Sequence, residues 1–266
     1  MILDFLYNHT LWLVGTIVVV VPVLLSCLGL WLFHRLVPYK LRFEHNEYAG
    51  YIIAVVGINY AILIAFVAVA VWGSFDKATA TAGKEAELVG NVYRTARGLG
   101  EPAATGIRTH LRNYVETVVK EEWPAMARAQ YPVTGWRSLE QIETMMEHYQ
   151  PQNATETVYM QEILAQLNQL YDARRERQAA SEKGVEPVVW VIVMLGTCLT
   201  IAFTFLFGMP SLRMHMLMTG GLTAATMLVL VLIISFDWPF RGNVQVDASM
   251  FNRVMENMRA LESRGG

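Results

Sequence analysis

The chain has 266 residues, 54% of them hydrophobic, and a mean hydropathy of +0.32 that is high for a water-soluble globular protein. Its formal net charge is only −2, which excludes the strong positive field that nucleic-acid-binding proteins use, so no nucleic-acid partner is expected. The two cysteines, Cys27 and Cys198, both lie in apolar runs, so the sequence indicates neither a disulfide framework nor a cysteine metal site.

Four apolar stretches are long enough to cross a bilayer, which takes roughly 20 residues of helix. They cover residues 11–33, 48–72, 187–207 and 211–236. The first two form one hairpin, and the last two form another that closes through the tight turn "GMPSLR". The sequence therefore predicts an all-α, polytopic membrane protein with four transmembrane helices in two hairpins.

The polar insert between the second and third spans reads as helical, because its apolar residues recur at helical spacing. Ser138 is the expected N-cap of one of its helices, and Asp247 or Ser249 is expected to cap an amphipathic helix in the tail. The predicted organisation is a first transmembrane hairpin, a helical extramembrane domain, a second transmembrane hairpin and an amphipathic tail: 1–72, 73–186, 187–236 and 237–266.

Tryptophans and short-loop charges predict the topology in a cell inner membrane. One register of the spans places four of the tryptophans at the interface nearest the helical domain and Trp31 at the other: Trp12, Trp72, Trp190 and Trp238. The hairpin turns carry Arg35, Lys40, Arg42 and Arg213, which favours cytoplasmic turns and an extracytoplasmic helical domain. Basic residues on the domain side oppose this orientation: Lys77, Lys84, Lys183 and Arg241.

The second span has one face made of small residues, which are Gly50, Ala54, Gly57, Ala61, Ala65 and Ala68. Small residues at spacings of three and four let two helix backbones approach closely, and such packing drives helix association in lipid. This face is interpreted as a helix-packing seam, with a pore-lining role as the alternative.

Asn59 lies almost opposite the seam, in a stripe otherwise made of apolar residues: Ile52, Val55, Ile62 and Phe66. An amide without a partner is costly in hydrocarbon, so this stripe is not expected to face lipid. Asn59 either bonds to a neighbouring helix or faces water at the centre of an assembly, where Ile62 and Phe66 would form a hydrophobic constriction. Tyr60 is expected to reach a threonine of the third span, with Thr197, Thr200 and Thr204 as candidates.

Polar residues at the ends of the spans are candidates for metal binding or for a pore mouth. His34, Glu44, His45, Glu47 and His215 share one side of the membrane, but their spacing fits no metal signature, so capping and snorkelling roles are favoured. His45, Glu47 and Arg241 are the pore-mouth candidates. Glu47 is also placed to complement a helix N-terminus.

The polar insert carries charges that need no chemistry to explain them. Glu121 and Glu122 are adjacent and point to different faces of a helix, which is poor geometry for an acid–base pair, and "RRER" at 174–177 is interpreted as a solvated charge run. The sequence contains no catalytic, cofactor-binding or metal-binding motif, so neither an enzyme nor a cofactor is expected.

Several blocks of the sequence, in this order, resemble a family of largely bacterial four-span membrane proteins known as bestrophin-like. They are "EHNEYAGYIIAVVGINYAILIAFVAVAVWGSFDKA", "EEWPAMAR", "LNQLYDARRER", "FTFLFG" and "DWPFRGNVQV", and together they cover nearly the whole chain. The resemblance implies kinship with bestrophins, which are pentameric anion channels whose second span lines an apolar neck.

The resemblance implies a homo-oligomeric ion channel, pentameric by analogy, with the bilayer, other copies of the chain and inorganic ions as partners. The alternative is a non-conducting scaffold or sensor whose helical domain binds a partner. The acidic calcium clasp of bestrophins has no counterpart in the tail, where "DWPFRGNVQVDAS" offers only Asp237 and Asp247, so calcium gating is not carried over.

Overall fold

The computed structural model describes residues 10–182 and 184–263, and all regular structure in these residues is helical. The longer helices are α2 (Leu11–Leu36), α4 (Asn46–Thr95), α5 (Ala103–Thr117), α7 (Trp136–His148), α8 (Ala154–Glu182), α9 (Pro187–Phe205), α10 (Leu212–Asp237) and α11 (Ser249–Ser263). The short ones are α3 (Tyr39–Phe43), the 3₁₀ turn η1 (Ala96–Gly98), the π-helical turn η2 (Val118–Glu122) and α6 (Trp123–Ala127).

Four of the helices are long and apolar enough to cross a membrane, namely those that contain the four predicted spans. The prediction of an all-α polytopic membrane protein is confirmed. The helix of the second span does not end with the apolar run, because it continues through the polar sequence after Trp72 as far as Thr95. That continuation contains alanines, lysines and glutamates, all strong helix formers, and no proline.

The chain forms two compact units. The membrane unit consists of the described residues up to Gly73 together with Gly184–Asp237, and the helical unit consists of Ser74–Lys183 with the chain from Trp238 onward. Helix α4 therefore contributes residues to both units. The tail packs into the helical unit, where Phe240, Val246, Phe251 and Met258 are buried in the core.

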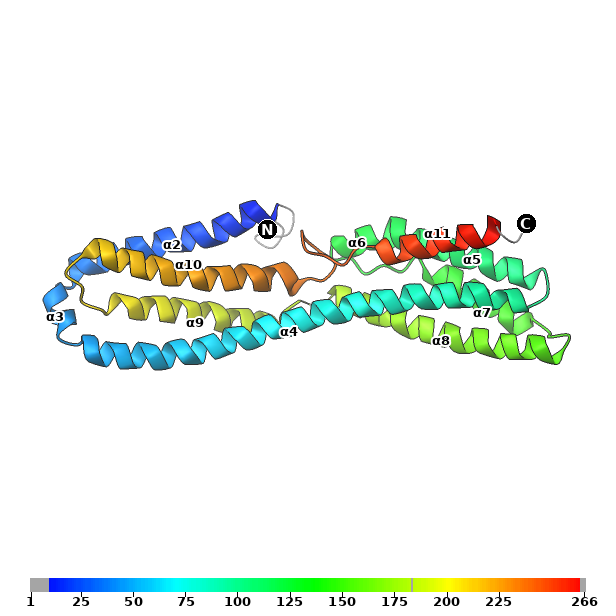
Figure 1. Cartoon of the computed structure of the whole chain (residues 1–266), viewed down its shortest axis with the longest axis horizontal. Coiled ribbons are helices and arrows are strands. Elements are labelled where there is room, and N and C mark those ends of the chain that lie inside the picture. Colours follow the sequence, from blue (N-terminus) through cyan, green and yellow to red (C-terminus); the bar gives the residue numbers. More distant parts are fainter. Residues whose placement is uncertain (1–9, 183, 264–266) are drawn as a thin grey trace. The chain divides into compact units, whose positions relative to one another are not determined.

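In the membrane unit α2 runs alongside α10 (Figure 1). Small residues allow the close approach, since a Cβ on Gly220 would lie 3.4 Å from the Cys27 sulfur and one on Gly15 would lie 3.7 Å from Val231. Helices α4 and α9 complete an apolar core built from Tyr60, Ile64, Val71, Val193, Met227, Leu230 and Ile233.

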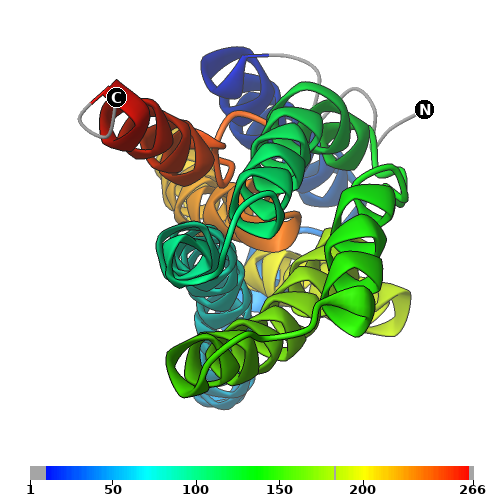
Figure 2. The same cartoon turned by 90° about the vertical axis from the view of Figure 1, so that its right-hand side faces the viewer.

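In the helical unit α5 lies between α11 and α7, as Figures 1 and 2 show. Helix α8 begins with a capping box, in which Asn153 accepts a hydrogen bond from the Glu156 amide at 2.9 Å and Glu156 accepts one from the Asn153 side chain at 3.0 Å. The prediction of Ser138 as an N-cap is wrong, because α7 already begins at Trp136, directly after Gly135. For α11 the predicted Asp247 is the side chain that accepts a bond from the Ser249 amide.

Candidate functional site

The stripe around Asn59 is open in the structure. Ile52, Val55, Ile62 and Phe66 are between 50% and 72% exposed, and Asn59 itself is exposed. Within residues 10–182 and 184–263, the Asn59 side chain has no hydrogen-bonding partner. All five residues lie in the most hydrophobic part of α4, so a polar amide stands uncovered inside a candidate membrane span.

The small-residue face of α4 is also open over most of its length. A Cβ added to Gly50 or Gly57 would have no atom within 4 Å, and Ala54, Ala61 and Ala65 are exposed. Ala68, at the end of the face, packs against the membrane-unit core. The predicted seam is therefore not formed within one chain over most of its length, and a role in packing between chains stays a prediction.

A third stripe of α4, between these two faces, packs on α9. Tyr60, Ile64 and Val71 are buried there, and a Cβ on Gly196 would lie 2.6 Å from the Tyr60 ring, so only glycine fits at that position. The Tyr60 hydroxyl lies 2.5 Å from Thr197 Oγ1, as the sequence predicted. This stripe and the contacts of the Tyr60 hydroxyl with Thr197 and the Val193 carbonyl attach the span to the rest of the membrane unit.

Arg42 locks the two hairpin turns of the membrane unit together. It is buried, and its guanidinium donates hydrogen bonds to the carbonyls of Phe205 (2.8 Å) and Phe207 (3.1 Å) at the end of α9. A cation at a helix C-terminus is stabilised by the carbonyls that lack helical partners. Its third bond goes to His34 Nδ1 at 2.8 Å, which makes that nitrogen an acceptor. The sequence by itself indicates Arg42 only as one of the basic residues that orient the hairpin turn.

The other histidines and carboxylates of this region do not converge. His215 is buried and bonds the Thr204 carbonyl through Nε2, whereas exposed His45 bonds the Leu41 carbonyl of its own turn. Among the described residues, no three histidine, cysteine or acidic side chains are grouped as a metal would require. Of the pore-mouth candidates, Glu47 and His45 are exposed in the membrane unit, while Arg241 is half-buried in the helical unit.

The helical unit contains a fully buried ionic network that joins three of its segments. Arg177 of α8 forms two bonds to Glu85 of α4, at 2.6 and 3.0 Å, and one to Glu122 of η2 at 2.8 Å. Arg174 of α8 binds both oxygens of Glu122, at 2.6 and 2.9 Å. All four side chains are completely buried, and their two positive and two negative charges cancel.

Hydrogen bonds and aromatic rings complete the surroundings of the four charges. The Tyr114 hydroxyl donates to Glu85 at 2.5 Å and accepts from Arg174, and the Gly135 amide donates to Glu122 at 2.9 Å. The Arg174 guanidinium lies 4.7 Å from the Trp136 ring centroid, and that of Arg177 lies 5.0 Å from Trp123. Aromatic faces attract desolvated cations. The rings and the hydrogen bonds together therefore offset the free-energy cost of taking these charges out of water.

Electrostatics keep the network ionised. Burial alone would raise the pKa of Glu122, but the hydrogen bonds and charges of Arg174 and Arg177 outweigh it and hold that pKa below its ordinary value. Burial would likewise lower the pKa of Arg177, and the Glu85 and Glu122 carboxylates reverse the shift. Burial raises the pKa of Tyr114, and the neighbouring Glu85 raises it further, so the phenol stays a donor.

The interpretation of "RRER" as a solvated charge run is wrong for two of its four residues. Arg174 and Arg177 are buried, whereas Arg175 and Glu176 are exposed. Since Arg174 and Arg177 are three residues apart on a helix, they share one face, which is the signal that the sequence offered. Glu121 and Glu122 do point to different sides, one exposed and one buried, as expected.

Comparison with proteins of known structure shows the same fold elsewhere. The bacterial bestrophin homologue from Klebsiella pneumoniae superposes with a TM-score of 0.65 at 15% identity, over 90% of this chain and 96% of that one. A point variant of that homologue gives 0.66 at 15% identity over 91% and 97%. A structure described only as a membrane protein gives 0.67 at 14% identity over 90% and 97%. At such identities the likeness shows the fold alone.

Among curated proteins the sequence has no match. The sequence model of the bestrophin-like domain matches residues 20–251, which include most of the first candidate span, the whole of the other three and most of both compact units. With four membrane helices, the bestrophin homologue fold and this match over most of its length, the chain belongs to the bestrophin-like family of multi-pass membrane proteins.

Proposed function

We propose that the chain is one subunit of a homo-oligomeric ion channel whose pore is lined by α4. The observation that supports this proposal is the open stripe around Asn59. A single chain leaves that amide uncovered in a candidate membrane span, where an unsatisfied polar group costs several kcal/mol. A water-filled axis shared by several chains removes that cost.

Around such an axis the stripe would form successive rings of polar and apolar side chains. Copies of Asn59 form a polar ring, and copies of Ile62 and Phe66 form apolar rings on one side of it. An apolar ring of this kind gates conduction by excluding water until it widens. Within one chain the Phe66 side chain is 72% exposed, which leaves it available to such a ring.

The small-residue face supports the oligomer independently of the pore. In a ring of identical chains each α4 needs one face for the axis and another for its neighbour. Gly50, Gly57 and Ala61 leave room for close backbone contact with a neighbouring chain. By analogy with bestrophins, the ring has five members and conducts anions, and the helical unit is placed outside the cytoplasm by the charges of the hairpin turns.

Ion flux from proteoliposomes tests the proposal. Phe66→Ala should raise flux because it widens the apolar constriction, and Asn59→Leu should change the ratio of permeabilities among small anions. Leu217→Ala is the matched control, since Leu217 is 70% exposed in another candidate span, α10, and lies outside α4. Flux that is absent, or equal in all four proteins, would remove α4 from the ion pathway.

The mass of the purified complex in detergent tests the oligomer separately. Gly57→Leu should reduce the complex to smaller species, because the added side chain blocks the small-residue face. Wild-type protein that is monomeric at all concentrations would exclude an axial pore and favour the scaffold or sensor alternative.

A further inference from the structure

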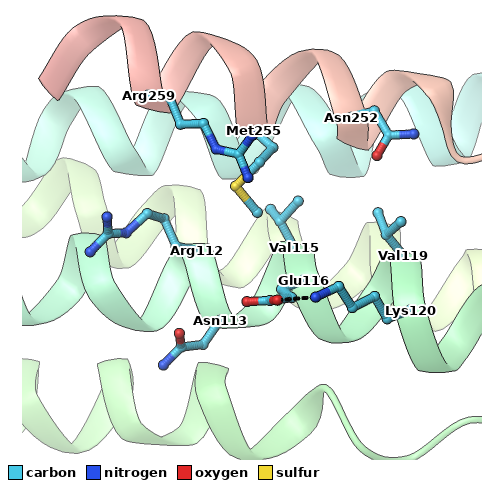
Figure 3. A pocket seen from close by; sticks show the side chains of 9 residues that line it. All are labelled: Arg112, Asn113, Val115, Glu116, Val119, Lys120, Asn252, Met255 and Arg259. Carbon is cyan, nitrogen blue, oxygen red and sulfur yellow. Dashed lines mark hydrogen bonds and ion pairs between the residues drawn. The ribbon is translucent and has the colours of Figure 1, made fainter. Parts of the chain in front are cut away.

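A groove of about 340 Å³ runs between α5 with η2 and α11, entirely within the helical unit. Its lining residues recur at helical spacing on both walls, Arg112, Asn113, Val115, Glu116, Val119 and Lys120 on one and Asn252, Met255 and Arg259 on the other. Figure 3 shows Met255 and Arg259 pointing from α11 toward α5, and Val115 and Val119 pointing back toward α11. The groove has none of the pore candidates in its walls.

The cations of the groove outnumber its carboxylates, three to one. Glu116 is occupied by Lys120, and the ion pair is drawn in Figure 3. The pKa of Glu116 lies below its ordinary value chiefly because of Lys120, with a smaller contribution from Arg259 of the opposite wall. Arg112 binds Glu262, at 3.0 Å, just outside the groove, and Glu262 also contacts Arg108.

Of the three cations of the groove, Arg259 is the one without an ion-pair partner among the described residues. Its guanidinium is exposed and has no hydrogen bond or ion pair within residues 10–182 and 184–263. The side-chain amides of Asn113 and Asn252 are equally without hydrogen bonds in that part of the chain. A guanidinium presents paired donors that match a carboxylate or phosphate. Asn252 lines the same wall as Arg259 and adds its side-chain amide to the groove.

Between these polar groups the groove has an apolar floor. Val115 is buried, and Val119 and Met255 pack partly against the helical-unit core while still lining the groove. Sites for small molecules combine an apolar lining with a few polar groups in this way and have volumes from about 300 to 1,000 Å³. An inorganic ion would leave the apolar floor uncovered.

We propose that this groove binds a small organic anion, with a carboxylate or phosphate head on an apolar body. The head lies against Arg259, and the body covers Val119 and Met255, which are only partly buried. The site is separate from the α4 stripe, and its occupation does not depend on whether the chain conducts ions.

Isothermal titration of the full chain in detergent tests the proposal, with phenyl phosphate and benzoate as probes. At least one of them should bind more tightly than both inorganic phosphate, which lacks the apolar body, and benzyl alcohol, which lacks the charge. If neither probe binds, or if inorganic phosphate binds as tightly as the better probe, the assignment is overturned.

Variants on α11 locate the site. Arg259→Gln should weaken binding of the better probe roughly tenfold, since a charge-assisted hydrogen bond is lost. Asn252→Asp places a negative charge in the groove and should weaken it similarly. Both side chains are exposed, so folding is preserved. Arg253→Gln on the same helix, outside the groove, is the control, and an equal loss there would show that the binding is general charge attraction.

Discussion

The two compact units bury charge differently. The membrane unit buries Arg42 in a hairpin turn against backbone carbonyls, whereas the helical unit buries a cluster of paired charges. In the membrane unit the buried pairs between spans are neutral: Ser26 with Thr223, Tyr60 with Thr197, and Thr204 with Thr219. The helical unit instead buries four full charges at its centre. A charge in a span is costly, whereas a neutral hydrogen bond there contributes about 0.6 kcal/mol on average, which is enough to orient two helices.

The buried charges of the helical unit are all paired with counter-charges. Each buried carboxylate of the helical unit binds at least one guanidinium through both oxygens, and each guanidinium also lies near an aromatic ring. The free-energy cost of desolvating these ions is offset only when each of them is fully paired. Removal of one member leaves its partners as buried charges without a counter-charge. The network therefore fixes α4, η2 and α8 in one arrangement, and the expected effect of breaking it is large.

The largest effect is expected for Glu122→Gln, which leaves both Arg174 and Arg177 short of a carboxylate. Breaking a buried ion pair from one side typically costs about 3–5 kcal/mol of the free energy of unfolding. Urea unfolding followed by tryptophan fluorescence reports it, because Trp123 and Trp136 lie against the two arginines. The control is Glu121→Gln, its exposed neighbour, and equal losses in the two variants would contradict the role given to the network.

The next effect is expected at Gly135, where the network admits no side chain. A Cβ there would lie 2.6 Å from Glu122 Oε1 and 2.8 Å from Arg174 Nη1, so Gly135→Ala should cost about 1–3 kcal/mol, as overpacking does. Gly57→Ala in the membrane unit is the contrast, since its Cβ would meet nothing within 4 Å of the same chain. If Gly57→Ala lowered the free energy of unfolding of the monomer and Gly135→Ala did not, the predicted difference between the two positions would be contradicted.

Acid should weaken the helical unit through Glu122. Its folded-state pKa is depressed, so its contribution is complete above the unfolded-state pKa of about 4.3 and is lost as pH falls from there through the folded value. Each pKa unit by which folding lowers the pKa of Glu122 contributes about 1.4 kcal/mol to the free energy of unfolding. Unfolding midpoints of wild type and Glu122→Gln, measured from pH 7 to pH 3, should therefore converge on acidification. A constant difference across this range would contradict the assignment.

The smallest effect is expected for Tyr60→Phe, which removes a neutral bond between spans. Such bonds contribute about 0.6 kcal/mol on average, so the variant should lower the thermal midpoint of the purified protein only slightly. Tyr51→Phe is the control, since Tyr51 is 68% exposed on the same helix. A loss as large as that of Glu122→Gln would show that the two units do not differ in the way described.

Much of the membrane unit follows from the sequence. Apolar runs of the right length predict the spans, because lipid forces every backbone group of a span into a helix. The contact between Tyr60 and Thr197 was also predictable, since a tyrosine inside a span needs a partner and the third span offers threonines at one face. Which threonine it reaches, and that Gly196 makes room for its ring, depended on the packing of α4 on α9.

The helical unit follows from the sequence only as a set of helices. Local patterns left Asp247 and Ser249 as alternative caps of α11, and it is Asp247 that accepts a bond from the Ser249 amide. The same patterns misplaced the start of α7, where Gly135 lies tight against the buried charges. Charged residues are mostly exposed, so "RRER" carried no sign of burial beyond a spacing of three. The π-helical turn that precedes Trp123, with Glu122 at its end, has no sequence signal that we recognise.

By itself the sequence determined four spans, two hairpins, a helical insert and an asparagine in the middle of a span, because each of these depends on residues near one another in the chain. Only the tertiary structure decided that Arg174 and Arg177 meet Glu85 and Glu122, and that Arg42 closes the end of α9. Those partners lie from 52 to 163 residues apart in the chain. A charged side chain is buried only where segments distant in the sequence place counter-charges or carbonyl groups beside it. Local sequence patterns do not show which distant segments come together in space.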